Sequence, residues 1–232
     1  MQEEYFADTA LIIAAGGSNR RFGPGRNKLL LSLKGMPVIC HALRNFLPML
    51  DPALALVLVP AGMHEVFKKA LAEGGIPPEV RVETGGESRQ ESVMNGLRAL
   101  PEKAEYVAVQ DGARPFTSAE ILKACLISAR RRGSGIAAHK VTDTIKVANP
   151  DGQVTSTPDR NTLWASETPQ VFKTSLIREA YEKVIRENRE TTDDAQVLES
   201  TGHPVYLVPH QENNRKITFA HDLDNSADHG SR

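Results

Sequence analysis

The stretch ALIIAAGGSNRRFGPGRNKLL, residues 10–30, combines an apolar run with a glycine-rich, basic segment. Its first five residues are apolar and predict a buried β-strand over 10–14. Two glycines follow directly, and then come Arg20, Arg21, Arg26 and Lys28. Glycines let backbone N–H groups approach phosphate oxygens, and this much positive charge at the end of a core strand is costly without an anion. The stretch therefore predicts a phosphate-binding loop, and a solvated basic loop without a ligand is the alternative.

Two common phosphate-binding patterns do not fit this loop. The dinucleotide fingerprint G-x-G-x-x-G needs a third glycine that is absent here. The Walker P-loop needs Gly before its Lys and Ser or Thr after it, whereas Lys28 lies between Asn27 and Leu29. What remains is a glycine turn followed by Arg21 and Lys28.

Short apolar runs alternate with amphipathic segments along the first 140 residues. We expect strands at 10–14, 54–59, 80–84, 106–110 and 135–139, and helices at 37–46, 65–71, 91–100 and 117–131. Thr117 and Glu120 have the spacing of a capping box for the last of these helices. The alternation predicts an α/β fold in one domain, residues 1–232, with a mainly parallel sheet and helices on both faces. Ligands of such sheets bind beyond the carboxyl ends of the strands, which predicts that the loops after Ala14, Thr84 and Gln110 lie along one edge.

Residues 140–164 interrupt this alternation. Polar and β-branched residues alternate around Asn149-Pro150-Asp151-Gly152, which is typical of a β-hairpin. A hairpin that protrudes from a domain needs a partner for its apolar side. We therefore expect a dimerisation arm at about 140–164 and a homodimer.

The composition excludes several classes of partner. The net charge of −1 produces no overall field that would attract nucleic acid or acidic lipid. No apolar run is long enough to span a membrane, and the acidic first ten residues do not have the pattern of a signal peptide.

Cys40 and Cys125 lie in apolar helical segments and predict buried thiols, with a disulfide as the alternative. We expect a cytoplasmic protein.

Two further motifs follow predicted strands. GGESRQESV, residues 85–93, offers the hydroxyls of Ser88 and Ser92 to a ribose or base, or serves only as a helix cap. QDGARPF, residues 110–116, places Asp111 at a strand end, where a carboxylate can hold Mg²⁺ or a substrate hydroxyl. Pairing of Arg114 with Asp111 is the purely structural alternative.

Three later motifs contribute single charged or polar residues. DRNTLWASETPQVF, residues 159–172, contains Arg160, which either reaches another subunit or pairs with Asp159 on the surface. TTDDAQVLE, residues 191–199, is typical of a helix start, and NNRKIT, residues 213–218, offers Lys216 to a phosphate or places it on an edge strand. The seven histidines show no metal-ligand spacing, and no arrangement indicates a covalent nucleophile.

Together the motifs resemble the 2-C-methyl-D-erythritol 4-phosphate cytidylyltransferases of the non-mevalonate isoprenoid pathway, from about residue 10 to 223. The matching motifs, in order, are AAGGSNRRFG, NKLL, GGESRQESV, QDGARPF, VTDTIK, DRNTLW, TPQVF, TTDDA and RKIT. The resemblance implies a Rossmann-like nucleotidyltransferase sheet, a homodimer joined by the protruding β-arm, and a single activity. That activity would be transfer of CMP from CTP to the phosphate of 2-C-methyl-D-erythritol 4-phosphate. A sugar-1-phosphate nucleotidyltransferase using another nucleotide, and a catalytically silent nucleotide-binding module, are the alternatives.

The resemblance also implies roles for individual residues. Arg21 and Lys28 would hold the triphosphate and stabilise the transition state, with Arg20 as the alternative to Arg21. Arg160, from the partner subunit, and Lys216 would position the phosphate of the second substrate. The pocket of that substrate would also be lined by Asp111, Arg114, Thr144 and Thr192.

The cytidine part of CTP would lie against small residues at the same strand ends. These are Ala14, Ala15, Gly16, Gly86, Ser92, Asp111 and Gly112. The resemblance further implies a divalent cation, usually Mg²⁺, held mainly by the CTP phosphates, with Asp111 considered as a protein ligand.

Overall fold

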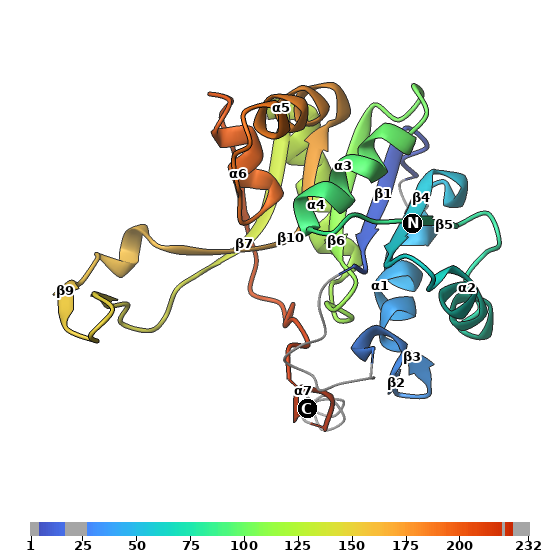
Figure 1. Ribbon diagram of the computed structural model, residues 1–232, viewed down its shortest axis with the longest axis horizontal. Coiled ribbons are helices and arrows are strands. Elements are labelled where there is room, and N and C mark those ends of the chain that lie inside the picture. Colours follow the sequence, from blue (N-terminus) through green and yellow to red (C-terminus); the bar gives the residue numbers. More distant parts are fainter. Residues whose placement is uncertain (1–4, 17–26, 220, 225–232) are drawn as a thin grey trace.

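A seven-stranded sheet forms the centre of the computed structural model, which describes residues 5–16, 27–219 and 221–224 (Figure 1). The strand order is β11-β7-β10-β6-β1-β4-β5. Strand β10 runs antiparallel to β6 and β7, and the other neighbours are parallel, so the predicted mainly parallel α/β sheet is confirmed. The bounds are β1 (Thr9–Ala14), β4 (Ala55–Val59), β5 (Arg81–Thr84), β6 (Tyr106–Asp111), β7 (Ser134–Lys140), β10 (Trp164–Lys173) and β11 (Leu207–Pro209).

Helices cover both faces of the sheet, as the sequence predicts. Along β1, Leu11 and Ile13 pack into one hydrophobic cluster while Ala10 and Ile12 pack into the other, because successive side chains of a strand point to opposite faces. Helices α1, α2 and α4 contribute to the first cluster, and α3, α5 and α6 to the second. The helices are α1 (Val38–Phe46), α2 (His64–Glu73), α3 (Arg89–Ala99), α4 (Ala119–Arg132), α5 (Thr174–Arg186), α6 (Asp194–Glu199) and α7 (His221–Asp224).

Short elements complete the fold. Strands β2 (Ser32–Leu33) and β3 (Met36–Pro37) form a small hairpin before α1. In the part of the chain that the structure describes, four single-turn 3₁₀ helices lie in the connections: η2 (Lys28–Leu30), η3 (Leu47–Met49), η4 (Pro52–Leu54) and η5 (Arg160–Thr162). Across the described ranges 5–16, 27–219 and 221–224, no helix combines the length and apolar character needed to cross a membrane.

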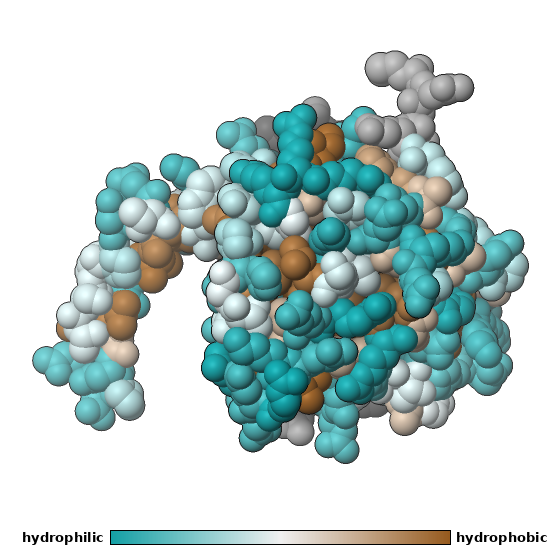
Figure 2. Space-filling view, turned by 90° about the horizontal axis from the view of Figure 1, so that it is seen from above, coloured by the Kyte–Doolittle hydropathy of each residue, from teal (hydrophilic) through white to brown (hydrophobic). Residues whose placement is uncertain are grey.

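The predicted hairpin in residues 140–164 is present as an arm that extends away from the sheet (Figure 1). Its strands are β8 (Val147–Ala148) and β9 (Val154–Ser156), paired antiparallel. Gly152, at φ +82°, closes the turn by donating its backbone N–H to the carbonyl oxygen of Asn149 at 3.0 Å. Hydrophobic residues are visible on the surface of the arm (Figure 2), and Val147 and Val154 are about half exposed.

Two details differ from the sequence predictions. The N-cap of α4 is Ser118, whose hydroxyl accepts from the backbone N–H of Ile121, so the Thr117–Glu120 capping box is wrong. Thr117 is instead fully buried, and its hydroxyl donates to Asn214 Oδ1 at 2.6 Å. Strand β10 has no counterpart among the predicted strands, because residues 166–170 (SETPQ) interrupt the apolar alternation and its register shifts there.

The two thiols agree with the prediction of buried cysteines. Cys40 in α1 and Cys125 in α4 are both free and fully buried. Burial raises the pKa of Cys40 to about 11, and the pKa of Cys125 to about 12. Both therefore remain protonated near neutral pH, and the disulfide alternative does not apply.

Candidate active site

The carboxyl ends of β1 and β6 lie side by side and form the floor of the candidate site. Ala14 is the register partner of Asp111. Beyond the strands, the backbone N–H of Gly112 donates to the carbonyl oxygen of Ala14 at 3.1 Å, and that of Ala15 donates to Leu58 at 3.0 Å. A Cβ on Gly112 would come within 3.2 Å of Ile13 Cγ2. The residues predicted to surround cytidine on these two strands are therefore adjacent, as expected for parallel strand ends.

A glycine turn before α3 borders the same floor. Ser92 Oγ accepts from the backbone N–H of Gly86 and donates to the carbonyl oxygen of Ser88, both at 2.8 Å. A Cβ on Gly86 would come within 2.4 Å of Glu91 Cγ, and one on Gly16 within 3.3 Å of Ser92 Oγ. Ser88 caps α3 by accepting from the backbone N–H of Glu91. The capping interpretation of this motif is confirmed, and Ser92 additionally fixes the turn that brings Gly86 to Gly16.

Asp111 is the centre of a cluster of opposite charges. Its Oδ2 lies 2.7 Å from Lys216 Nζ and 3.7 Å from Arg114 Nε, while its Oδ1 lies 3.7 Å from Arg89 Nε. The backbone N–H of Asp111 donates to Thr168 Oγ1 at 3.0 Å. Burial alone would raise the pKa of Asp111, but Lys216, Arg89 and Arg114 together hold the pKa below its usual value. Asp111 is therefore ionised throughout the neutral pH range.

Lys28, in η2, reaches the same edge of the sheet and contacts a segment near the C-terminus. Its Nζ donates to the carbonyl oxygen of Ile217 at 2.8 Å, and the backbone N–H of Ile217 donates to Ala113 at 2.8 Å. Asn27 caps η2 by accepting from the backbone N–H of Leu29, and Leu29 is buried in the core. The segment that carries Lys216 is thus held against the loop after β6, next to Lys28.

Arg114 is held mainly by groups other than Asp111. Its Nη1 donates to Glu167 Oε1 at 3.1 Å and to the carbonyl oxygen of Asn214 at 2.6 Å. Glu167 also accepts from Asn214 Nδ2 at 3.0 Å, and His210 Nε2 lies 2.8 Å from its Oε2. Arg114 and Lys216 both line a cavity of about 730 Å³ beside this network. Arg114 therefore ties β10 and the segment at 214 to the site, and also faces Asp111.

Arg89 is a site residue that sequence analysis did not single out. Its Nη1 and Nη2 donate to the two carboxylate oxygens of Asp194 at 3.0 and 2.6 Å, and its Nε faces Asp111. Asp194 lies in the TTDDA motif, which has the ordinary pattern of a helix start. In the sequence, only the presence of Arg89 in GGESRQESV could have indicated this role, because its partner Asp194 lies far away in the chain.

Thr192 lies just before α6, where the predicted helix start is confirmed. Asp193 caps the helix by accepting from the backbone N–H of Gln196 at 2.9 Å. The backbone N–H and hydroxyl of Thr192 lie 2.7 and 3.1 Å from Gln196 Oε1, and the residue is exposed. Its contacts connect it to α6 rather than to Asp111.

The remaining predicted residues are not brought to this edge. Arg160 and Thr144 lie on the arm and are exposed, and Arg160 Nη1 donates to the carbonyl oxygen of Thr142 at 3.0 Å. Asp159 does not act as the partner of Arg160, since it caps η5 by accepting from the backbone N–H of Asn161. Arg21 and its alternative Arg20 lie outside the described residues.

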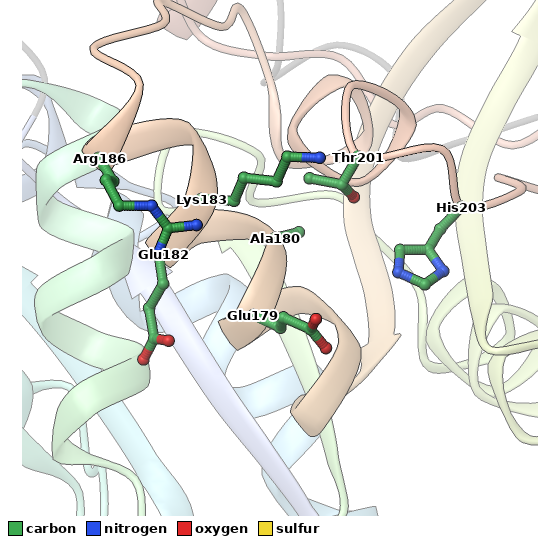
Figure 3. A pocket seen from close by; sticks show the side chains of 7 residues that line it. All are labelled: Glu179, Ala180, Glu182, Lys183, Arg186, Thr201 and His203. Carbon is green, nitrogen blue, oxygen red and sulfur yellow. The ribbon is translucent and has the colours of Figure 1, made fainter.

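Two further features of the described residues bear on the choice of site. The described part of the chain contains no group of three or more His, Cys, Asp and Glu side chains able to hold a metal ion. Another pocket, of about 230 Å³, lies between α5 and the segment that carries Thr201 and His203, and Figure 3 shows charged side chains of α5 around it: Glu179, Glu182, Lys183 and Arg186. Acidic and basic side chains are balanced there, so the pocket offers no net field for an anion.

The comparisons with known proteins agree on one family. The family model of 2-C-methyl-D-erythritol 4-phosphate cytidylyltransferase matches residues 9–228. A protein of that name from Synechocystis sp. is 38% identical over 92% of this chain and 93% of its own length. One from Trichormus variabilis is 40% identical, with the same coverage of 92% and 93%.

Solved structures give the same result for the fold. The crystal structure of 4-diphosphocytidyl-2C-methyl-D-erythritol synthase from Anaerococcus prevotii matches with a TM-score of 0.82 at 28% identity, covering 95% of this chain and 96% of that one. The cytidylyltransferase structure from Thermus thermophilus matches with a TM-score of 0.74 at 28% identity, covering 93% and 95%.

Proposed function

Since the chain belongs to the 2-C-methyl-D-erythritol 4-phosphate cytidylyltransferase family, we propose that the charged cluster at the ends of β1 and β6 carries out that family's reaction. The protein is a nucleotidyltransferase that transfers CMP from CTP to the phosphate of 2-C-methyl-D-erythritol 4-phosphate. The products are 4-diphosphocytidyl-2-C-methyl-D-erythritol and pyrophosphate, and the step belongs to isoprenoid precursor synthesis.

The main obstacle to this reaction is repulsion between two anions. An oxygen of the substrate phosphate attacks the α-phosphorus of CTP in line, and the bond from that phosphorus to the bridging oxygen breaks. Pyrophosphate leaves with the electron pair. A phosphate monoester is largely deprotonated near pH 7, because its second pKa is about 6, so the mechanism needs no protein base. The enzyme's contribution is therefore positioning and stabilisation of negative charge.

Lys28 supplies positive charge to the α-phosphate and the leaving group in this proposal, together with Arg21. The position of Lys28 supports this role, because η2 holds it at the strand ends and its Nζ donates to a backbone carbonyl. A phosphate oxygen carries negative charge, so it would attract the ammonium more strongly than this neutral carbonyl oxygen does. Such preorganised charge is typically worth about 3–4 kcal/mol of barrier.

Lys216 positions the phosphate of the second substrate, while Asp111 and Arg114 line its pocket and Thr192 borders it. The support is that Lys216 and Arg114 both contact Asp111 and both line the cavity beside β10. Holding the attacking oxygen near the α-phosphorus converts binding energy into orientation. To bind the phosphate, Lys216 must leave Asp111 Oδ2. Arg89 and Arg114 remain close to Asp111, so its negative charge stays partly neutralised when Lys216 leaves.

A homodimer completes the site in this proposal, with Arg160 and Thr144 contributed by the partner's arm. Two observations support it. Both residues lie on the arm, away from the chain's own Asp111, and Ile145, Val147 and Val154 on the same arm are exposed. Apolar side chains on a protruding hairpin are stabilised when a second subunit covers them. The single domain 1–232 with its arm at about 140–164 is part of the same proposal.

The nucleotide is proposed to lie over Ala14, Ala15, Gly16, Gly86, Ser92 and Gly112, where backbone groups are closest to the strand ends. Magnesium fits this edge as a nucleotide complex, because Lys216 already lies on Oδ2 of Asp111 and the described residues offer no group of three or more His, Cys, Asp and Glu side chains to hold the ion. When bound, Mg²⁺ would neutralise part of the triphosphate charge. Two unpaired buried thiols support a cytoplasmic location.

The observation that carries the assignment of the site is the convergence of Lys28, Lys216 and Asp111 at adjacent strand ends. The test is pyrophosphate release with CTP, UTP, GTP and ATP in turn, each with 2-C-methyl-D-erythritol 4-phosphate and Mg²⁺. We expect release with CTP alone. Equal release with UTP or GTP would favour a sugar-phosphate nucleotidyltransferase, and no release with any nucleotide would favour a silent binding module.

A further inference from the structure

A line of four side chains runs from the second core cluster to the candidate site. The hydroxyl of Tyr181 in α5 donates to Asp194 Oδ1 at 2.5 Å. Both oxygens of Asp194, at the start of α6, accept from the two terminal nitrogens of Arg89. Arg89, at the start of α3, places its Nε 3.7 Å from Asp111 Oδ1.

The inner part of this line is rigid. Asp194 is fully buried and Tyr181 is 1% exposed, so neither side chain has water as an alternative partner. Burial, and then the negative charge of Asp194, raise the pKa of Tyr181 well above its usual value, so the hydroxyl keeps its proton and donates. A planar guanidinium held by two parallel bonds has little rotational freedom. The edge of Arg89 that carries Nε is therefore held in one direction, toward Asp111.

If Arg89 had only a structural role, pairing with the buried carboxylate of Asp194 would be sufficient. Arg89 already neutralises that buried carboxylate, yet 30% of its side chain remains exposed at the site and faces a second carboxylate. Burial opposes the charged form of Arg89, but Asp194 and then Asp111 raise its pKa above the usual value. The cation thus serves one carboxylate in the core and one at the site.

Asp111 is in turn divided between its cations. Arg89 lies on Oδ1, whereas Lys216 and Arg114 lie on Oδ2. With Arg89 on one side, the carboxylate keeps one orientation and presents Oδ2 to Lys216. Without Arg89, the carboxylate is free to turn and engage Lys216 with both oxygens, which withdraws the ammonium from an incoming phosphate.

We propose that Arg89 is a positioning residue of the transfer reaction, clamped by Asp194 and Tyr181 so that it orients Asp111 and, through it, Lys216 toward the second substrate's phosphate. This inference rests on the proposed roles of Asp111 and Lys216. In this arrangement the geometry of the site is set from the core side of α3, α5 and α6. Arg89 itself does not contact the reacting atoms.

The test compares Arg89→Lys and Tyr181→Phe with a matched control, Arg178→Lys. Arg178 also joins α5 to α3, since its Nη2 donates to the carbonyl oxygen of Leu97 at 3.0 Å, but at the far end of α3. The control therefore perturbs the same pair of helices without touching the line to Asp111. Steady-state kinetics with each substrate varied in turn give separate KM values.

We expect Arg89→Lys to raise KM for 2-C-methyl-D-erythritol 4-phosphate roughly tenfold, below the hundredfold typical of full misplacement. Lysine keeps the charge but loses the fork that fixes its direction. Tyr181→Phe should raise the same KM a few-fold, and KM for CTP should stay unchanged in both variants. Arg178→Lys should match the wild type in both constants.

The pH profile gives a second readout that loss of stability would not produce. Among the described residues, Arg89, Lys216 and Arg114 are the charged groups that lower the pKa of Asp111, and losing the aligned Arg89 weakens this effect. The acid limb of kcat/KM should therefore move to higher pH in Arg89→Lys. Because the substrate phosphate titrates equally for every variant, the shift is measured as the difference from wild type.

The outcomes separate this inference from the proposed function. If Lys216→Met and Asp111→Asn leave KM for the second substrate unchanged, the proposed site itself is wrong. If those two raise it and Arg89→Lys does not, or if Arg89→Lys raises KM for CTP instead, only the positioning role is overturned. Should Arg89→Lys fail to fold, Tyr181→Phe, which removes one hydroxyl, decides the question by the same KM comparison.

Discussion

The strand-end cluster around Asp111 and the arm at 140–164 both hold residues assigned to the reaction, but they are built in opposite ways. At the strand ends, the side chains of Asp111 and Arg114 are each 12% exposed, and each contacts several charged or polar groups. On the arm, Val147 is 46% exposed and Val154 is 53% exposed. The side chains of the first region pack and pair within one chain, whereas the second region exposes apolar side chains.

The two regions therefore differ in how far one chain positions its own side chains. Lys28, Lys216 and Asp111 are positioned by the parallel sheet, so their mutual geometry is a property of the fold. In the proposed homodimer, Arg160 and Thr144 would be placed relative to the substrates by the second subunit.

The largest effect is expected at the strand ends, from Lys28→Ala. We expect kcat to fall at least about a hundredfold, because removal of one preorganised cation costs about 3 kcal/mol of barrier. Folding should be retained, since the buried side chain of η2 is Leu29. Pyrophosphate release measures the effect, and Lys68→Met in α2 serves as the surface control. Turnover near that of the wild type would remove Lys28 from the mechanism.

The next effect tests whether the arm completes the partner's site. Arg160→Ala should lower kcat/KM for the second substrate more than tenfold, as expected for loss of a charge that orients the attacking phosphate. Mixing this variant with Lys28→Ala should restore about a quarter of wild-type activity, since half of the dimers are then mixed and each has one intact site. Absence of any recovery would show that Lys28 and Arg160 act in the same chain or that the chains do not exchange.

A smaller effect is expected from Val154→Asp on the arm. A charge in place of an apolar side chain should weaken the dimer by roughly tenfold, because burying an unpaired carboxylate is unfavourable. Sedimentation velocity across a dilution series measures the dissociation constant. Val66→Asp in α2, which replaces another half-exposed valine, is the matched control. If the two variants associate equally, the arm is not the interface.

The smallest effect concerns stability and pH at the strand ends. The pKa of Asp111 is lowered in the fold by Lys216, Arg89 and Arg114 despite burial. Its ion pairs therefore stabilise the fold above the ordinary Asp pKa of 3.8, and that contribution is lost as the pH falls through the lowered value. Wild-type Tm should decrease by a few degrees more than that of Asp111→Asn between pH 6 and the acid limit of folding. Exposed Asp151→Asn on the arm should follow the wild type, and parallel curves for all three proteins would contradict the coupling.

Local patterns were sufficient to predict most of the scaffold. The apolar runs that became β1, β4 and β6, the glycine turn of the arm and the start of α6 each depend on neighbouring residues. The order of strands and helices then placed Ala14 and Asp111 at one edge. For these features the relevant physics acts over a few residues, so the sequence alone carries it.

Features that depend on distant partners were not predictable in the same way. Thr117 has good capping chemistry, but burial against Asn214 redirects its hydroxyl and leaves the cap to Ser118. The pairing of Arg89 with Asp194 joins residues far apart in the chain, and either residue alone has an ordinary local role. Strand β10 is stabilised by pairing on both sides despite its polar middle.

In the proposed mechanism, cations at the ends of β1 and β6 offset the repulsion between the triphosphate and the substrate phosphate. A crystal structure with a non-hydrolysable CTP analogue, Mg²⁺ and 2-C-methyl-D-erythritol 4-phosphate would show where both phosphate groups bind. We expect Lys28 Nζ to leave the carbonyl oxygen of Ile217 and bind the triphosphate, and Lys216 to bind the substrate phosphate. A triphosphate bound elsewhere, with Lys28 still on Ile217 and Lys216 still on Asp111, would rule this mechanism out.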